Sequence, residues 1–106
     1  MSRSFAHLHL HTEYSMLDGA SRVGDAVAAA AADGQPAIGI TDHGNMYGTL
    51  EFYKECRRQG IKPIIGTEAY MAHDHRSERP ARRGRLDDSG GDTEGGRKLY
   101  YHITLL

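Results

Sequence analysis

The sequence predicts an α/β fold, because short apolar segments alternate with helix-forming segments along its length. In order, these segments are strand, helix, strand, helix, strand, polar loop and strand. Such an order favours parallel strands, since a helix between two strands returns the chain to the edge where the first strand began. A length of 106 residues leaves room for one small domain.

The first expected strand, Phe5–His11, is indicated by strict alternation of residue types. His7, His9 and His11 share one face, and the other face is apolar. Three imidazoles on one face are costly to bury unless each finds a partner. We therefore expect this face to belong to a polar site, followed by a loop over residues 12–19.

The first expected helix, Val23–Asp33, is rich in alanine and has Ser21 as its expected N-cap. Gly34 and Pro36 follow, and both residue types are typical of a helix end. The short apolar segment Ala37–Thr41 is then expected to be a buried strand.

A second helix is expected over Met46–Gln59, ending at Gly60. At helical spacing, its buried stripe is expected to hold Met46, Thr49, Leu50, Tyr53 and Cys56. Both helices are expected to pack on one side of the sheet. Cys56 is expected to be an inert core residue.

The rest of the chain is expected to hold two strands, Lys62–Ala72 and Lys98–Leu106. Between them, 73–97 is rich in Arg, Asp and Gly and predicts an exposed polar loop, with His73 and His75 in solvent. Four strands leave open edges, and the chain ends within an apolar strand, so we expect it to be part of a larger domain.

Composition excludes several function classes. The 13 Lys and Arg nearly balance the 14 Asp and Glu, giving a net charge of −1, which argues against a strongly basic nucleic-acid clamp. No apolar run is long enough to span a membrane, and the first ten residues lack the pattern of a secretion signal. The single cysteine excludes an internal disulfide and fits a reducing compartment, so a cytoplasmic location is expected.

Polar residues recur near the expected strand ends, where parallel α/β folds build their active sites. They are His9, His11, Asp42, His43, Glu68 and His102. Imidazole nitrogens together with carboxylate oxygens suit Zn, Mn or Fe. Each residue also has a structural alternative: His102 alone could be a hydrogen-bonded core residue, and Asp42-His43 could belong to a turn completed by Gly44-Asn45. Their combination favours a metal site.

Three motifs give the chain a family resemblance. They are HLHLHTEYSMLDG from His7 to Gly19, TDHGNM from Thr41 to Met46, and GIKPIIGTEAY from Gly60 to Tyr70. Together they resemble the PHP (polymerase and histidinol phosphatase) domain, and more narrowly the version found at the start of bacterial DNA polymerase III alpha subunits, in an actinobacterial style. The resemblance implies a partial distorted (β/α) barrel of PHP type, with residues 1–106 forming its N-terminal portion of about four strands and two helices.

The resemblance also implies a site with two to three divalent metals in the complete domain, Mn or Zn. Matched to the family motif, the metal ligands are His9, His11, Asp18, His43, Glu68 and His102. His7 and Asp42 would orient the ligand rings from behind. The later ligands of the family, and the Mg-binding aspartates of its polymerase site, would lie past residue 106.

The implied function is that of a replicative polymerase whose PHP region removes mispaired nucleotides by metal-dependent 3′–5′ exonuclease action. DNA primer-template would be the substrate, and other replicase subunits such as the sliding clamp would bind through regions outside this chain. The 106 residues alone would be inactive, since they lack the later ligands. The alternatives are a stand-alone phosphoesterase of the histidinol-phosphatase kind and a non-catalytic structural PHP remnant.

Overall fold

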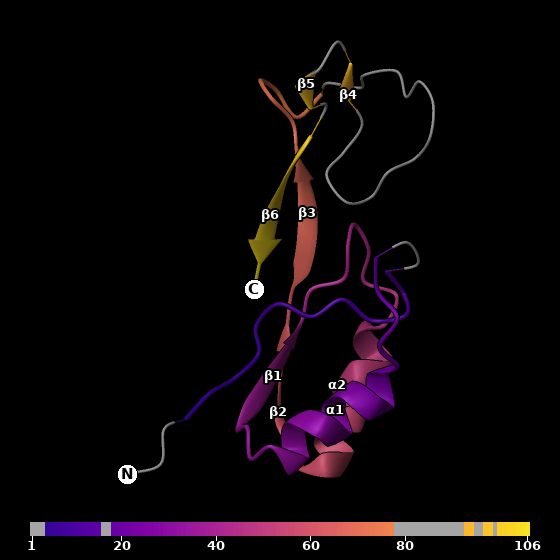
Figure 1. Ribbon diagram of the computed structural model, residues 1–106, viewed down its shortest axis with the longest axis vertical. Coiled ribbons are helices and arrows are strands. Elements are labelled where there is room, and N and C mark those ends of the chain that lie inside the picture. The colour runs from indigo at the N-terminus through magenta and orange to yellow at the C-terminus, as the bar shows by residue number, and fades with distance from the viewer. Residues whose placement is uncertain (1–3, 16–17, 78–92, 95–96, 99) are drawn as a thin grey trace.

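A computed structural model describes residues 4–15, 18–77, 93–94, 97–98 and 100–106. Two helices and the strands β1 and β2 form the lower half of the molecule in Figure 1, and β3 and β6 extend upward from it. The elements are α1 (Val23–Ala32), β1 (Ala37–Ile40), α2 (Thr49–Gln59), β2 (Lys62–Ile65), β3 (Thr67–Met71), β4 (Thr93–Glu94), β5 (Arg97–Lys98) and β6 (Tyr101–Leu105). The α/β class expected from the sequence is confirmed.

The centre of the fold is the parallel pair β1 and β2, with Ala37 opposite Lys62 and Ile40 opposite Ile65. The segment expected as the first strand runs parallel beside β1 and is joined to it by an isolated bridge from His7 to Ile38. The expected parallel order is confirmed here. Phe5–His11, however, is not a continuous strand, since its contacts with β1 are this bridge and scattered hydrogen bonds.

The hydrophobic core lies between this sheet and the two helices, which lie on the same side of β1 and β2 (Figure 1). Helix α1 buries Val23 and Val27, and α2 buries Phe52 and Cys56. Burying an aromatic or branched side chain is worth about 1.5–3 kcal/mol. Packing against the sheet therefore contributes more to these short helices than their intrinsic propensity does.

Two details of the helices differ from the prediction. Helix α1 has Arg22 rather than Ser21 at its N-cap and no side-chain cap there. Helix α2 begins at Thr49 rather than Met46. Of its expected stripe, Cys56 is buried, but Met46, Leu50 and Tyr53 are exposed, and Phe52 is fully buried instead. The face of α2 is set by Phe52 and Cys56, a pair four residues apart that alone reaches the core.

The segment expected as one strand over Lys62–Ala72 is two strands that separate at Gly66. From this point β3 pairs with β6 in antiparallel register, with Tyr70 opposite His102, while Glu68 keeps the parallel register with the segment that follows β1. The general expectation of parallel strands does not hold for this pair. A Cβ at position 66 would collide with the carbonyl oxygen of Leu105, so glycine permits the close approach of these chains.

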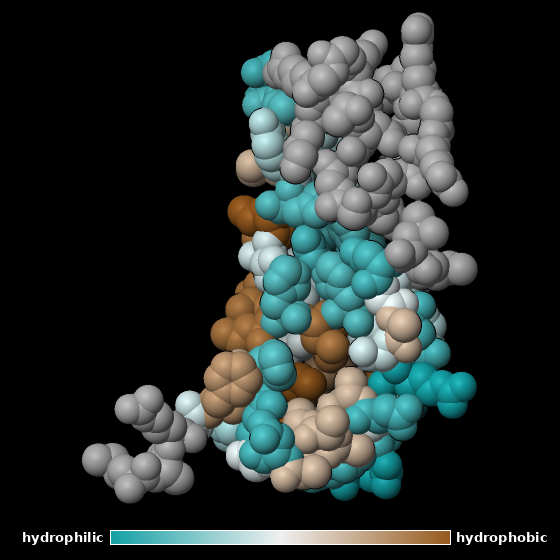
Figure 2. Space-filling model, in the orientation of Figure 1, coloured by the Kyte–Doolittle hydropathy of each residue, from teal (hydrophilic) through white to brown (hydrophobic). Residues whose placement is uncertain are grey.

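Part of the expected polar loop 73–97 lies outside the described residues. Within the described part, β4 and β5 form a short antiparallel pair. His75 is exposed as expected, whereas the half-buried His73 packs edge-to-face on Tyr101 with ring centroids 4.9 Å apart. Hydrophobic side chains gather along the side of the molecule where β6 runs (Figure 2), where Ile103 and Leu105 are exposed. None of the described helices is long and apolar enough to cross a membrane.

Candidate metal centre

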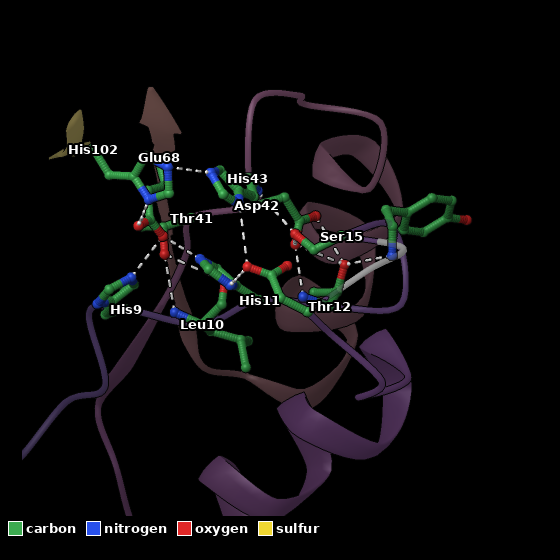
Figure 3. A network of polar contacts seen from close by, with 12 residues as sticks. His9, Leu10, His11, Thr12, Ser15, Thr41, Asp42, His43, Glu68 and His102 are labelled. Atoms are coloured by element: carbon green, nitrogen blue, oxygen red, sulfur yellow. Dashed lines mark hydrogen bonds and ion pairs between the residues drawn. The ribbon is translucent and has the colours of Figure 1, made fainter. Parts of the chain in front are cut away.

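Glu68 lies at the centre of a cluster of imidazoles, near the point where the β1–β2 pair meets the β3–β6 pair (Figure 3). Its main chain is held in place from both directions, because the Glu68 amide donates to the Asp42 carbonyl and its carbonyl accepts from the Gly44 amide. This pairing extends the parallel register of β1 past its own end, through the bridge between His43 and Glu68. The continued register thus places Glu68 beyond the carboxyl end of β1.

Three imidazoles contact the Glu68 carboxylate. The Nε2 of His9 lies 2.8 Å from Oε2, and the Nε2 of His11 contacts the same oxygen. On the other oxygen, Oε1, the Nδ1 of His102 lies at 3.2 Å. Side chains from the N-terminal segment and from β6, far apart in sequence, therefore meet on one carboxylate.

A second group surrounds His43, whose side chain is almost completely buried. The Nε2 atoms of His43 and His102 face each other at 3.1 Å. The Oδ2 of Asp18 lies 3.1 Å from the Nδ1 of His43 and 3.1 Å from the Nδ1 of His11. Asp18 therefore connects the two groups on the side away from Glu68.

Burial tends to raise the pKa of the Glu68 carboxyl, because it penalises the charged form. The hydrogen bonds and charges of His9 and His11 act in the opposite direction and outweigh burial, so the pKa of Glu68 lies below its ordinary value. The carboxylate is consequently ionised at neutral pH, as a metal ligand must be.

The cluster fits a divalent metal on the chemistry of its donors. Both nitrogens of His11 face carboxylate oxygens, and the two Nε2 atoms of His43 and His102 face each other. A neutral imidazole carries a single N–H, and the Nδ1 atoms of His43 and His102 also face carboxylate oxygens. With each N–H directed at a carboxylate, the remaining nitrogen lone pairs face one another or an oxygen unless a proton or a cation lies among them. Two sets of three donor atoms lie within 4.8 Å of one another, His9–His11–Glu68 and His43–Glu68–His102. Imidazole and carboxylate donors suit Mn or Zn.

The structure brings together all six predicted ligand candidates, although their role as ligands stays a prediction. The two residues expected to orient ligand rings are placed differently. The His7 ring packs edge-to-face on Phe5 at 5.1 Å, and no described contact joins it to the cluster. The Asp42 carboxylate, 1% exposed, accepts hydrogen bonds from Thr12 and Ser15 instead of from an imidazole.

Three residues of this region were not expected from the sequence. Thr12 and Ser15 are buried polar residues that bind Asp42, and the Tyr70 ring stacks on His43 with centroids 4.9 Å apart. Tyr70 lies two residues after Glu68 on β3, so the alternation of the strand places both side chains on one face and could have indicated Tyr70. Thr12 and Ser15 lie in a segment expected to be a loop. Because hydroxyl residues are common in loops, their presence there did not indicate a site.

A comparison with protein families matches residues 7–106 to the PHP domain. The chain belongs to the PHP domain family. The match covers the whole cluster, from the N-terminal histidines to His102.

Relatives of the PHP chain include DNA polymerase III alpha subunits. The chain is 49% identical to the subunit of Saccharopolyspora erythraea over 96% of its length, and 48% identical to that of Mycobacterium tuberculosis over 97%. It is also 48% identical to the subunit of Aquifex aeolicus over 100% of its length. The chain spans only 8–9% of the length of these relatives.

Among solved structures, an amidohydrolase from Chromobacterium violaceum resembles this PHP chain with a TM-score of 0.57 and 28% identity. The likeness covers 65% of this chain and 24% of the amidohydrolase. The mixed α/β structure of this chain is consistent with a partial barrel related to that of the amidohydrolase.

Proposed function

We propose that this chain is the N-terminal part of the PHP domain of a replicative DNA polymerase alpha subunit, and that its cluster takes part in metal-dependent hydrolysis of a phosphodiester bond at a DNA 3′ end. The observation that carries the proposal is the convergence of three imidazoles, two from the N-terminal segment and one from β6, on the Glu68 carboxylate. A site of this composition has no need of a serine or cysteine nucleophile.

His9, His11 and Glu68 would hold one divalent ion, and His43, Glu68 and His102 would hold another, with Asp18 beside both. Mn or Zn held there would lower the pKa of a water molecule and neutralise phosphate oxygens. The chain's own residues supply the framework. The buried, ionised Glu68 fixes the orientation of the imidazoles that contact it, and Asp18 aligns the rings of His11 and His43 from the side away from Glu68.

Two comparisons support a phosphate ester of DNA as the substrate. The relatives that cover nearly the whole chain are named as DNA polymerase III alpha subunits. The amidohydrolase neighbour is described with a bound sulfate, a tetrahedral anion of the same shape as phosphate. We propose primer-template DNA as the substrate, replicase subunits such as the sliding clamp as partners of other regions, Mg for the polymerase site of those regions, and the cytoplasm as the location.

The test is a comparison of two activities in the alpha subunit that carries this chain, expressed from its whole reading frame. With Mn²⁺ and a 3′-mismatched primer, we expect His43→Ala to abolish removal of the terminal nucleotide and to leave extension of a matched primer intact. His75→Ala, which alters an exposed histidine bonded to Ser77, is the matched control and is expected to change neither activity.

The alternatives give different outcomes in this experiment. A phosphoesterase of the histidinol-phosphatase kind would release phosphate from a small phosphomonoester and leave the mismatched primer uncut. A structural PHP remnant would cut neither substrate, and His43→Ala would then lower only stability. Unchanged removal of the mismatch in His43→Ala would contradict the proposal.

A further inference from the structure

A buried unit of side chains lies behind the candidate metal centre and is made of Thr12, Ser15 and Asp42, all at most 2% exposed. Asp42 is the unusual member, because an isolated ionised carboxylate is costly to bury. No ion pair to Asp42 is found among the described residues. Its oxygens are met instead by the Thr12 amide at 2.6 Å, the Thr12 hydroxyl at 2.8 and 3.0 Å, and the Ser15 hydroxyl at 3.1 Å.

The Ser15 hydroxyl connects this carboxylate to His43. A hydroxyl has a single hydrogen, and that of Ser15 is donated to Asp42. Its oxygen is therefore left to accept, and it accepts from the His43 amide at 2.8 Å. The chain of contacts from Asp42 through Ser15 fixes the main chain of His43 at the point where β1 ends (Figure 3).

The main chain of Ser15 holds the second part of the site. Its carbonyl accepts from the Asp18 amide at 3.1 Å and from the Gly19 amide at 2.7 Å, which closes the turn that carries Asp18. The Ser15 amide donates to the Thr12 carbonyl at 2.9 Å. A Cβ at position 19 would collide with that same carbonyl oxygen, so the turn is tightly closed.

We infer that the Thr12–Ser15–Asp42 unit positions Asp18 and His43 relative to each other, so that its hydroxyls set the metal affinity of the site without touching the metal. This inference rests on the proposed function, because it takes Asp18 and His43 as parts of a metal centre. Thr12, Ser15 and Asp42 are positioning residues: Asp42 holds the loop, the loop holds Asp18, and Ser15 holds His43. The cost of burying Asp42 is offset by this network rather than by a cation.

The chain offers a closely matched pair of variants at Thr12. Thr12→Val keeps the branched shape and removes the hydroxyl that donates to Asp42, whereas Thr12→Ser keeps the hydroxyl and removes a methyl group. Ser15→Ala removes the bond to the His43 amide. Cys56→Ala, in the core and outside the unit, lowers stability by loss of packing and serves as the control for destabilisation alone.

The experiment measures Mn²⁺ binding and thermal unfolding in the alpha subunit that carries this chain. We expect Thr12→Val and Ser15→Ala to weaken Mn²⁺ binding about 10–100-fold, the range seen when groups that orient ligands are lost. Thr12→Ser and Cys56→Ala should bind Mn²⁺ as the unchanged protein does. The gain in melting temperature on adding Mn²⁺ should shrink in the first two variants only, because stabilisation by a ligand follows its affinity.

Each other outcome has a definite meaning. If Thr12→Val and Ser15→Ala melt earlier but bind Mn²⁺ unchanged, the unit is structural only and the inference is wrong. The inference also fails if Thr12→Ser is as defective as Thr12→Val. If Ser15→Ala does not fold, the Thr12 pair decides. Absence of both Mn²⁺ and Zn²⁺ binding in the unchanged protein would instead overturn the proposed function, which separates the two failures.

Discussion

Glu68 is the residue whose loss should affect the site most, because it belongs to both groups of donors. In Glu68→Gln the side chain keeps its shape and loses its charge and one acceptor oxygen. Its amide group would then face the imidazoles of His9 and His11, and an amide nitrogen is no ligand for Mn²⁺ or Zn²⁺. We therefore expect both candidate ions to be bound more weakly.

The size of the effect follows from the contacts. Loss of a group that only orients a ligand costs about 10–100-fold in affinity. Glu68 contacts three imidazoles directly, so the loss should be at least about 100-fold. At about 1.4 kcal/mol for each tenfold change, this corresponds to about 2.8 kcal/mol of binding free energy.

The assay is calorimetric titration with Mn²⁺ at neutral pH, with bound ions counted by electron paramagnetic resonance. Glu55→Gln is the matched control, since Glu55 is on α2 and its carboxylate binds Arg58 and Gln59 away from the site. The control should bind Mn²⁺ as the unchanged protein does. If Glu68→Gln retains both the number of ions and their affinity, Glu68 is not a shared ligand and the assignment of the site is refuted.

Three further predictions concern stability and reactivity. The folded-state pKa of Glu68 lies below its ordinary value of 4.5, so the stability that Glu68 contributes should be present above pH 4.5 and lost as the pH falls through the folded pKa. Urea unfolding at several pH values, with a chelator present to remove metal, should show this fall, and Glu68→Gln should reduce it. Burial raises the pKa of the Cys56 thiol to about 11, so stability should decrease as the pH rises above the ordinary thiol pKa of 9. A thiol reagent at pH 8 should label Cys56 only on unfolding, and rapid labelling of the folded protein would contradict its burial. Gly66→Ala should destabilise the fold by collision with Leu105, whereas Gly24→Ala, in an open helical position, should stabilise it by up to about 1 kcal/mol; equal effects in urea unfolding would count against the described approach at Gly66.

The parallel centre of the fold could be predicted from the sequence, because two apolar segments flank a helix of suitable length. The pairing with β6 that begins after Gly66 could not. One continuous apolar pattern covers β2 and β3, and only the approach of β6 shows why the chain changes partners there. The face of α2 was also misjudged, since Leu50 and Phe52 are both apolar and only the position of the sheet selects Phe52.

The site was more accessible to prediction, because His9 and His11 lie two residues apart in the first segment and both reach Glu68. Their meeting with Glu68 and His102 was expected from the positions of these residues near the strand ends, whereas the ligand role of Asp18 required the family resemblance. The roles given to His7 and Asp42 depended on packing. The Asp42 carboxylate accepts from Thr12 and Ser15 because the loop 12–15 folds over the end of β1, and the His7 ring packs on Phe5. The local sequence pattern does not predict either arrangement.

The most direct test of the central claim is anomalous diffraction from crystals of the alpha subunit that carries this chain, grown with Mn²⁺. The account predicts anomalous peaks among the imidazoles of His9, His11, His43 and His102, with each peak about 2.0–2.2 Å from an oxygen atom of the Glu68 carboxylate. Peaks elsewhere in the PHP domain, with ordered water or no density in this cluster at saturating Mn²⁺, would contradict it.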